Sequence, residues 1–154
     1  FDNNAYPLLK KYNQKASIYI ICNYVNGPNY LTTDQIKEMV DSGLVSVQTH
    51  TLSHRELTSL SLEEMEKELI ESKKYLDSTY NINVDTICYP IGKYNDTIVN
   101  KAKEIYKYGL AMTGGVYNSK KHDLYRIPRI YANRSMTINQ FANYLKQSNV
   151  EIIY

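Results

Sequence analysis

The most informative part of the sequence is an apolar alternation that runs into a pair of histidines. Residues 44–54 read Leu44-Val45-Ser46-Val47-Gln48-Thr49-His50-Thr51-Leu52-Ser53-His54. The alternation of apolar and polar residues up to Gln48 predicts a half-buried strand over 44–48. His50 therefore follows the carboxyl end of a strand, which is where ligands gather in α/β folds.

The two histidines suggest a metal site without proving one. His50 and His54 are two of the chain's three histidines, and they lie four residues apart. Imidazoles at this spacing can share one face of a helical turn and bind one ion together. Surface histidines that cap a turn have the same spacing, so both interpretations stay open. The zinc-protease motif HExxH is excluded because Thr51, not Glu, follows His50.

Helical periodicity alternates with strand-like runs along the chain. Helices are predicted over 5–12, after the capping boxes Thr32–Gln35, Ser61–Glu64 and Thr137–Gln140, and over 97–107 behind a cap at Asn95 or Asp96. Strands are predicted over 16–22, 44–48, 84–89, 110–113 and 150–153, with an extended 125–130 that Pro128 interrupts. This order favours a parallel α/β sheet, open or closed.

Apolar stripes predict which helical side chains face the core. The expected core residues are Leu62, Met65, Leu69 and Leu76 in the longest helix and Ile138, Phe141 and Leu145 in the last one. The Lys and Glu residues of the longest helix are expected to form a solvated face. Gly109 is expected just past the end of the 97–107 helix.

Composition limits the class of protein. A chain of 154 residues, 43% hydrophobic and 22% charged, suits a single domain over 1–154. A net charge of +2 without a basic run predicts no nucleic-acid surface. No apolar run reaches the roughly 20 residues of a membrane span. Cys22 and Cys88 lie in strand-like runs and are expected to be buried thiols, not a disulfide.

Several motifs together resemble a known family. Residues 48–57 resemble the H-S/T-x-x-H signature of the polysaccharide deacetylases, the NodB-homology enzymes of carbohydrate esterase family four. Residues 5–12 with 15–19, 88–95 and 126–130 are similar to further motifs in the same order, and 88–95 has the form found in poly-N-acetylglucosamine deacetylases. The resemblance implies a distorted (β/α) barrel of about seven strands.

The resemblance also implies an activity. It indicates metal-dependent removal of N-acetyl groups from a β-linked N-acetylglucosamine polymer outside the cytoplasmic membrane. His50 and His54 would be the metal ligands. Zn²⁺ is the expected ion, with Co²⁺, Ni²⁺ and Mn²⁺ as alternatives. Such an ion polarises the acetyl carbonyl and lowers the pKa of a water, whose proton a carboxylate takes.

Further roles follow by position in the motifs. The backbone N–H of Ile91 is expected to donate to the oxyanion, and Tyr89 and Pro90 are expected to contact the glycan. Many relatives carry an arginine where this chain has a cysteine, at position 88. Either Arg126 or Arg129 supplies that charge, or these are surface arginines that flank an edge strand; both interpretations stay open. His122 lies in a polar loop and is expected to be exposed and without a catalytic role.

The family's first motif is the main departure. It reads T-F-D-D, with a general base and a metal ligand, whereas this chain begins Phe1-Asp2-Asn3. Either Asp2 is that base and the metal aspartate is replaced, or Asp2 belongs to a segment that follows the motif, and the first strand is absent. We favour the second register, which predicts weak zinc binding and no hydrolysis unless the missing segment is supplied. The alternative function is a non-catalytic carbohydrate-binding or scaffold domain.

Overall fold

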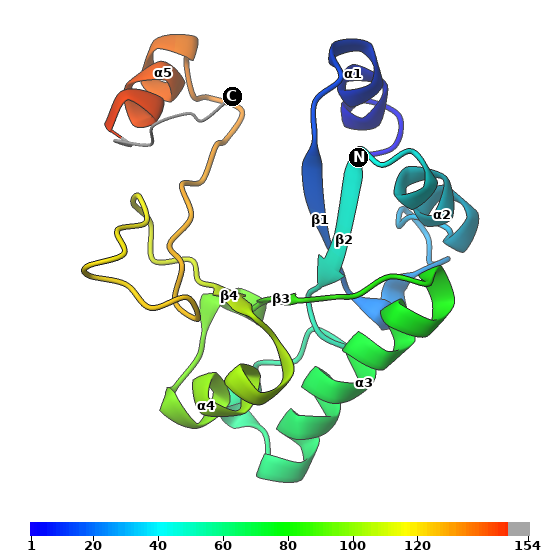
Figure 1. The fold of residues 1–154 in the computed structure, drawn as a ribbon, viewed down its shortest axis with the longest axis vertical. Coiled ribbons are helices and arrows are strands. Elements are labelled where there is room, and N and C mark those ends of the chain that lie inside the picture. The colour runs from blue at the N-terminus through cyan, green and yellow to red at the C-terminus, as the bar shows by residue number, and fades with distance from the viewer. Residues whose placement is uncertain (148–154) are drawn as a thin grey trace.

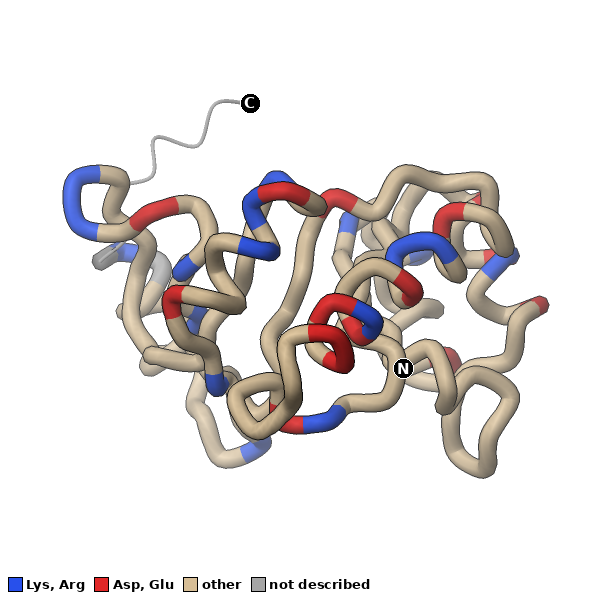
Figure 2. Tube along the Cα trace, turned by 90° about the horizontal axis from the view of Figure 1, so that it is seen from below, with Lys and Arg blue, Asp and Glu red and all other residues tan. Residues whose placement is uncertain are grey.

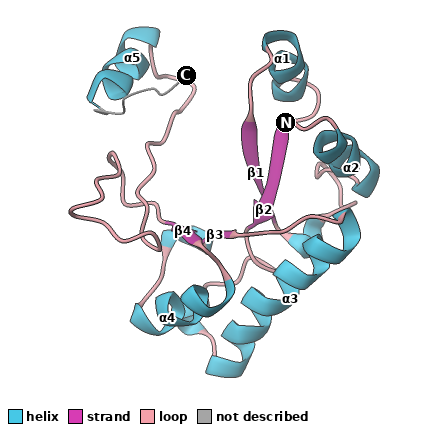
Figure 3. Ribbon diagram, in the orientation of Figure 1, coloured by secondary structure: helices cyan, strands magenta, loops and turns pink. Residues whose placement is uncertain are grey.

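The computed structural model describes residues 1–147 and shows helices alternating with parallel strands (Figure 3). The elements are α1 (Ala5–Tyr12), β1 (Ala16–Ile20), η1 (Cys22–Tyr24), α2 (Thr33–Asp41), β2 (Val45–Thr49), η2 (Leu57–Ser59), α3 (Leu62–Tyr80), β3 (Thr86–Cys88), η3 (Pro90–Gly92), α4 (Asp96–Ile105), β4 (Tyr108–Leu110) and α5 (Ile138–Gln147). The predicted α/β class is confirmed. The strand predicted at 150–153 lies outside the described residues.

The four strands form one sheet in the order β1-β2-β3-β4, and all neighbours are parallel. Ile127 adds an isolated parallel bridge to Leu110. Figure 1 shows β1 and β2 running side by side, with β3 and β4 turned away from that direction by the twist of the sheet. The sheet is smaller than the seven or so strands implied by the resemblance. Parallel pairing places the carboxyl ends of β2 and β3 side by side, and both candidate motifs follow these ends.

The core lies between this sheet and the helices that cover it. Its fully buried side chains include Ile36 and Met39 of α2, Leu69 and Leu76 of α3, and Ile98 and Val99 of α4. All three capping boxes are present, because Thr32, Ser61 and Thr137 each accept a hydrogen bond from the backbone N–H three residues later. Asn95, not Asp96, caps α4, accepting from the N–H of Ile98 at 3.0 Å.

Four of the predicted core-facing residues need correction or go untested. Leu62 is 59% exposed because it is the first residue of α3, and the buried stripe begins only at Met65. Ile138 and Phe141 are exposed because α5 stands apart from the sheet (Figure 1). The side chain of Leu145 is not among those that the structure describes.

The fourth strand also differs from the prediction. It occupies Tyr108–Leu110, two residues earlier than expected, so Gly109 is a strand residue and does not follow the helix. A Cβ at Gly109 would lie 2.5 Å from the hydroxyl of Tyr89 and 2.7 Å from the carbonyl oxygen of Tyr125. The glycine thus permits a close approach of two segments within the sheet.

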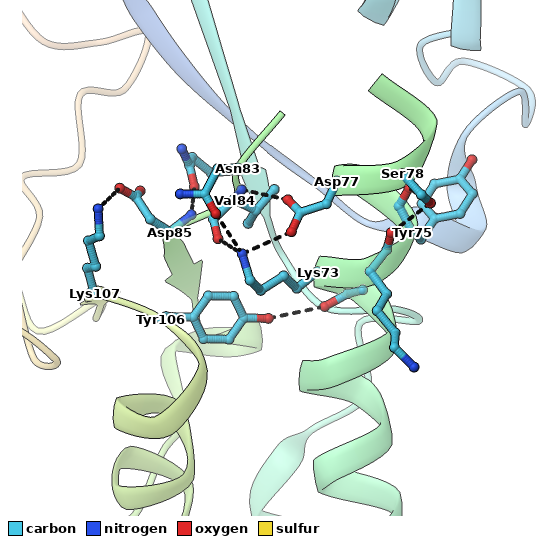
Figure 4. A network of polar contacts seen from close by, with 12 residues as sticks. Lys73, Tyr75, Asp77, Ser78, Asn83, Val84, Asp85, Tyr106 and Lys107 are labelled. Atoms are coloured by element: carbon cyan, nitrogen blue, oxygen red, sulfur yellow. Dashed lines mark hydrogen bonds and ion pairs between the residues drawn. The ribbon is translucent and has the colours of Figure 1, made fainter. Parts of the chain in front are cut away.

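A polar network fixes the chain where it enters β3 (Figure 4). Lys73 pairs with Asp77 one turn along α3 at 3.0 Å and also donates to the carbonyl oxygen of Val84. Asp77 accepts from the N–H of Val84 at 2.7 Å. The hydroxyl of Tyr106 donates to the carbonyl of Leu69 in the same helix. These contacts tie β3 to α3 and so fix where β3 delivers the motif that follows it.

Charged residues of both signs are interspersed over the chain, in keeping with the net charge of +2 (Figure 2). Within residues 1–147, no helix combines the length and the apolar character needed to cross a bilayer. Both cysteines are buried free thiols, as predicted, and the Sγ of Cys22 donates to the carbonyl of Ser72 at 3.6 Å.

Candidate active site

The structure brings the two histidines of the motif together. The ring centroids of His50 and His54 are 4.7 Å apart and their planes make an angle of 66°. His50 directly follows β2, and its N–H donates to the carbonyl of Ile20 at the end of β1, at 2.8 Å. The pair therefore lies where the sequence predicted it, at the carboxyl end of the central strands.

The surroundings of His50 fix which ring nitrogen is free. Its Nδ1 lies 2.7 Å from the carbonyl oxygen of Cys88, which can only accept, so Nδ1 carries the proton. This leaves the Nε2 lone pair available to a ligand. Burial lowers the pKa of His50 below its ordinary value of 6.5; the bond to Cys88 opposes this shift, while His54 and Arg129 add to it. The ring is therefore neutral at pH 7, which is the form that binds metal ions.

The turn between the histidines is a left-handed bend, not the helical turn that the four-residue spacing permits. Thr51 has φ +70° and His54 has φ +63°. The hydroxyl of Thr51 accepts from the N–H of His54 at 3.1 Å, and the backbone N–H of Thr51 donates to the hydroxyl of Thr49 at 3.0 Å. Two short threonine contacts thus replace the helical hydrogen bonds and turn the second ring toward the first.

The turn after β3 is strained in the same way. Ile91 has φ +58° and ψ 3°, and Gly92 follows with φ +71°. A Cβ on Gly92 would lie 2.6 Å from the Cβ of Met112. Pro90 is buried, whereas Ile91 is 54% exposed at the tip of the turn. The Ile91 backbone is thus held in a fixed direction three residues after Cys88, whose carbonyl oxygen contacts Nδ1 of His50 and links the two motifs.

Among residues 1–147, left-handed backbone at residues other than asparagine and glycine is confined to these two turns. Asparagine tolerates this conformation, whereas it is costly for β-branched residues. In the described part of the chain, four of the seven non-glycine residues with positive φ are asparagines, namely Asn13, Asn26, Asn29 and Asn81. The other three are Thr51, His54 and Ile91. Strain of this kind concentrates at functional sites, which supports placing one here.

The two arginines of the late motif have different positions. Arg126 pairs with Asp96 and Asp123 and lies over the ring of Tyr94 at 5.9 Å, so it is committed to the start of α4. Arg129 donates to the carbonyl of Ala111 at 3.1 Å. Burial raises the pKa of Cys88, and the charge of Arg129 opposes this shift. Arg129 also lowers the pKa of His50. Of the arginines that the sequence left open, Arg129 is therefore the one whose charge acts on Cys88 and His50.

Tyr89 and Asp2 each make a contact within the protein. Tyr89 is fully buried, and its hydroxyl donates to the carbonyl of Tyr125 at 3.0 Å, which argues against direct contact with a glycan. The carboxylate of Asp2 accepts from Gln35 at 2.8 Å beside a cavity of about 470 Å³. Asp2 lies in a turn before α1, not in a strand, as expected for the second register of the first motif.

A third metal ligand is the missing part of the site. In the part of the chain from 1 to 147, no group of three or more His, Cys, Asp or Glu residues is arranged to hold an ion. His122 lies in a partly exposed loop, where its Nδ1 accepts from the N–H of Asn118 at 3.0 Å. The described residues therefore offer two imidazoles that fit a metal and leave the carboxylate ligand unassigned.

Sequence reasoning missed Glu68. It was assigned to the solvated face of α3, yet it is 5% exposed and its carboxylate binds Ser53, the residue before His54. Its place between Met65 and Ser72 on the buried stripe is the signal that could have identified it.

Comparisons with known proteins agree on one family. A family model for polysaccharide deacetylase matches residues 1–109. A poly-beta-1,6-N-acetyl-D-glucosamine N-deacetylase of Staphylococcus aureus is 34% identical over 143 aligned residues, covering 82% of this chain and 48% of the relative. The chain spans about half the length of the curated relatives it matches, 51% in the case of a Bacillus subtilis protein.

Solved structures agree as well. A Streptococcus pyogenes deacetylase in complex with acetate matches with a TM-score of 0.87 and 34% identity, covering 94% of this chain and 64% of that one. A polysaccharide deacetylase from Bacillus cereus matches with a TM-score of 0.87 and 31% identity, covering 94% and 47%.

Proposed function

Because this chain belongs to the polysaccharide deacetylase family, we propose that it carries the histidine half of a metal-dependent N-deacetylase site. The proposed substrate is a β-linked N-acetylglucosamine polymer, the class named for the staphylococcal relative. The observation that carries the proposal is the contact between His50 Nδ1 and the Cys88 carbonyl, which leaves Nε2 of the His50 ring available to a ligand beside the ring of His54.

The donor set suits a divalent ion. Two neutral imidazoles are common ligands of Zn²⁺, and Co²⁺, Ni²⁺ and Mn²⁺ accept the same groups. When bound, such an ion supplies Lewis-acid polarisation of the acetyl carbonyl. The contribution of this chain is orientation: the Cys88 carbonyl holds the ring of His50, and Thr51 holds the backbone of His54.

The 90–92 turn supplies the second proposed element. Hydrolysis of an amide develops negative charge on the carbonyl oxygen, and a fixed backbone N–H stabilises it. The Ile91 N–H is the proposed donor, because Pro90 and Gly92 hold the turn on either side. Arg129 is proposed to give the site positive charge from the side of Cys88.

The rival function is a glycan-binding or scaffold domain without catalysis. It is favoured by one observation, the lack of a third metal-ligating side chain beside the pair within residues 1–147. Both functions predict glycan binding, whereas only the hydrolase predicts metal binding through the histidines. The proposed activity belongs outside the cytoplasmic membrane, where such polymers lie, and fractionation of cells that express the protein tests this.

Calorimetric titration with zinc is the decisive first experiment. We expect weak binding by the wild-type chain that falls at least about tenfold in His54→Gln. The matched control is His122→Gln, which removes the histidine outside the motif and should leave zinc binding unchanged. Equal loss in both variants, or no binding in the wild type, would contradict the metal site.

Acetate release from a β-1,6-linked N-acetylglucosamine oligomer separates the two functions. We expect no release by this chain alone, and release once a Thr-Phe-Asp-Asp strand is fused before Phe1, since that strand would supply the acids. The fused chain with His54→Gln should be inactive. Oligomer binding by a zinc-loaded fused chain that releases no acetate would favour the scaffold function.

A further inference from the structure

A buried carboxylate ties the histidine turn to helix α3. Glu68 is 5% exposed. Its Oε2 accepts from the N–H of Ser53 at 2.9 Å, and its Oε1 accepts from the hydroxyl of the same serine. Ser53 is the residue before His54, so both hydrogen bonds act on the turn that delivers the second histidine ring.

Packing alone does not explain an acid at this position. Glu68 lies on the buried stripe of α3 between Met65 and Ser72, and its neighbour Leu69 is fully buried. The ion pairs of the described residues give it no basic partner. Burying a carboxylate is costly unless hydrogen bonds satisfy it. The two donors of Ser53 therefore satisfy the buried acid, and through them the acid contacts the histidine turn.

The turn needs support from outside because its backbone is strained. Thr51 and His54 both have positive φ. The N–H groups of Cys22 and Asn23 in η1 donate to the carbonyls of Thr51 at 3.2 Å and of Leu52 at 2.9 Å. Helix α3 presents Glu68. The turn is thus held by two elements: η1 donates to the carbonyls of the turn, and Glu68 of α3 accepts from an N–H and a hydroxyl of the turn.

We infer that Glu68 is a positioning residue that keeps the left-handed turn formed before any ligand binds, so that the ring of His54 stays beside His50. The inference rests on the proposed function, since the histidine pair is what the clamp would serve. It assigns Glu68 no contact with substrate or metal. The clamp is the pair of hydrogen bonds from Ser53 to Glu68.

Backbone amide hydrogen exchange, followed by NMR in the metal-free 154-residue chain, tests the clamp directly. Glu68→Leu keeps the apolar packing and removes both acceptors. It should speed exchange of the His54 amide at least about tenfold, because the closed turn loses the stabilisation expected of hydrogen bonds to a charged group. Glu68→Gln keeps an acceptor for the Ser53 N–H, and its amide can bond to the hydroxyl. In this variant the His54 backbone amide should exchange within about threefold of the wild-type rate. Ser53→Ala removes one bond without touching the core and should give an intermediate rate.

A matched variant on the same helix separates positioning from general destabilisation. Leu76→Ala opens the core under α3 without contacting the turn and should raise exchange across the helix but not selectively at His54. A selective rise in Glu68→Leu and in Ser53→Ala supports the clamp. Equal exchange of the His54 amide in Ser53→Ala and wild type, or the same pattern in Leu76→Ala as in Glu68→Leu, overturns it.

Zinc affinity, measured by competition with a chelator, gives the second readout. It should fall about tenfold in Glu68→Leu and stay within about threefold in Glu68→Gln, in the same order as the exchange rates. Unchanged affinity in Glu68→Leu overturns the link between the clamp and the histidine pair. If the wild type binds no zinc, the proposed function fails, and the exchange experiment still decides whether the clamp holds the turn.

Discussion

Replacing Gly92 with alanine tests whether the 90–92 turn is rigidly packed. Gly92 has φ +71°, and a Cβ there would lie 2.6 Å from the Cβ of Met112. That atom is the rigid base of the side chain, so rotation of Met112 cannot relieve the contact. The variant therefore has two penalties, a left-handed alanine and an overpacked contact, and we expect the free energy of unfolding to fall.

The size of the effect follows from these two penalties. A left-handed conformation costs an L-residue about 1–2 kcal/mol. Overpacking of this kind costs about 1–3 kcal/mol. Alanine also lowers the conformational entropy of the unfolded chain, which offsets about 0.4–1 kcal/mol of this cost. We expect Gly92→Ala to destabilise the chain by about 3 kcal/mol. Gly43→Ala is the matched control, because Gly43 has φ +68° and open space around its Cβ position, and it should cost only about 1 kcal/mol.

Urea unfolding of the three proteins, followed by circular dichroism, measures the difference. The midpoint should fall much further for Gly92→Ala than for Gly43→Ala, with similar slopes. The double variant Gly92→Ala with Met112→Gly should recover the overpacking part and keep the backbone part. Equal costs for the two single variants would refute the idea that Met112 packs the turn into one conformation, and with it the fixed direction of the Ile91 N–H.

Two further predictions concern His50 and α3. Burial lowers the pKa of His50, so below its ordinary value of 6.5 the unfolded chain binds more protons than the folded chain, and stability should fall as pH drops from about 7 to 5. His50→Gln should flatten this part of the curve in urea unfolding at each pH, and an unchanged slope would contradict the assignment. On α3, Leu76→Ala should cost about 2–5 kcal/mol because Leu76 is fully buried, whereas Leu62→Ala should change stability by no more than about 0.5 kcal/mol. Thermal and urea unfolding measure both changes. Equal losses of stability in the two variants would show that the buried stripe of α3 is assigned wrongly.

The parts of the fold that local chemistry decides were predictable. The alternation at 44–48 gave β2 within one residue, and the boxes at Thr32 and Ser61 form as expected, since each depends on residues three apart. Strands β3 and β4 have only three residues each. Their bounds are set by partners far away in the sequence, so the pattern within each run could not fix them. Gly109 shows why: its role depends on Tyr89 and Tyr125, which only the folded sheet brings close.

The candidate site was likewise predictable from the sequence only in part. The four-residue spacing after a strand left two interpretations open, and together with the family resemblance it predicted that His50 and His54 meet. It could not predict the left-handed bend between them, because that bend depends on contacts from η1 and α3. The choice between Arg126 and Arg129 was likewise open in the sequence, since acidic partners from the start of α4 and from the preceding loop determine that Arg126 turns away.

The distribution of strain ties these observations together. Thr51, His54 and Ile91 each hold a conformation that costs on the order of 1–3 kcal/mol, and they occupy two turns that follow neighbouring strands. Such residues persist only where the surroundings determine them. Three specific contacts determine them here. The His54 N–H donates to the Thr51 hydroxyl, Glu68 accepts from the Ser53 N–H, and Met112 packs against Gly92. A turn that formed only on ligand binding would not need these supports in the free chain, so the structure argues that the histidine pair and the Ile91 amide are arranged in advance.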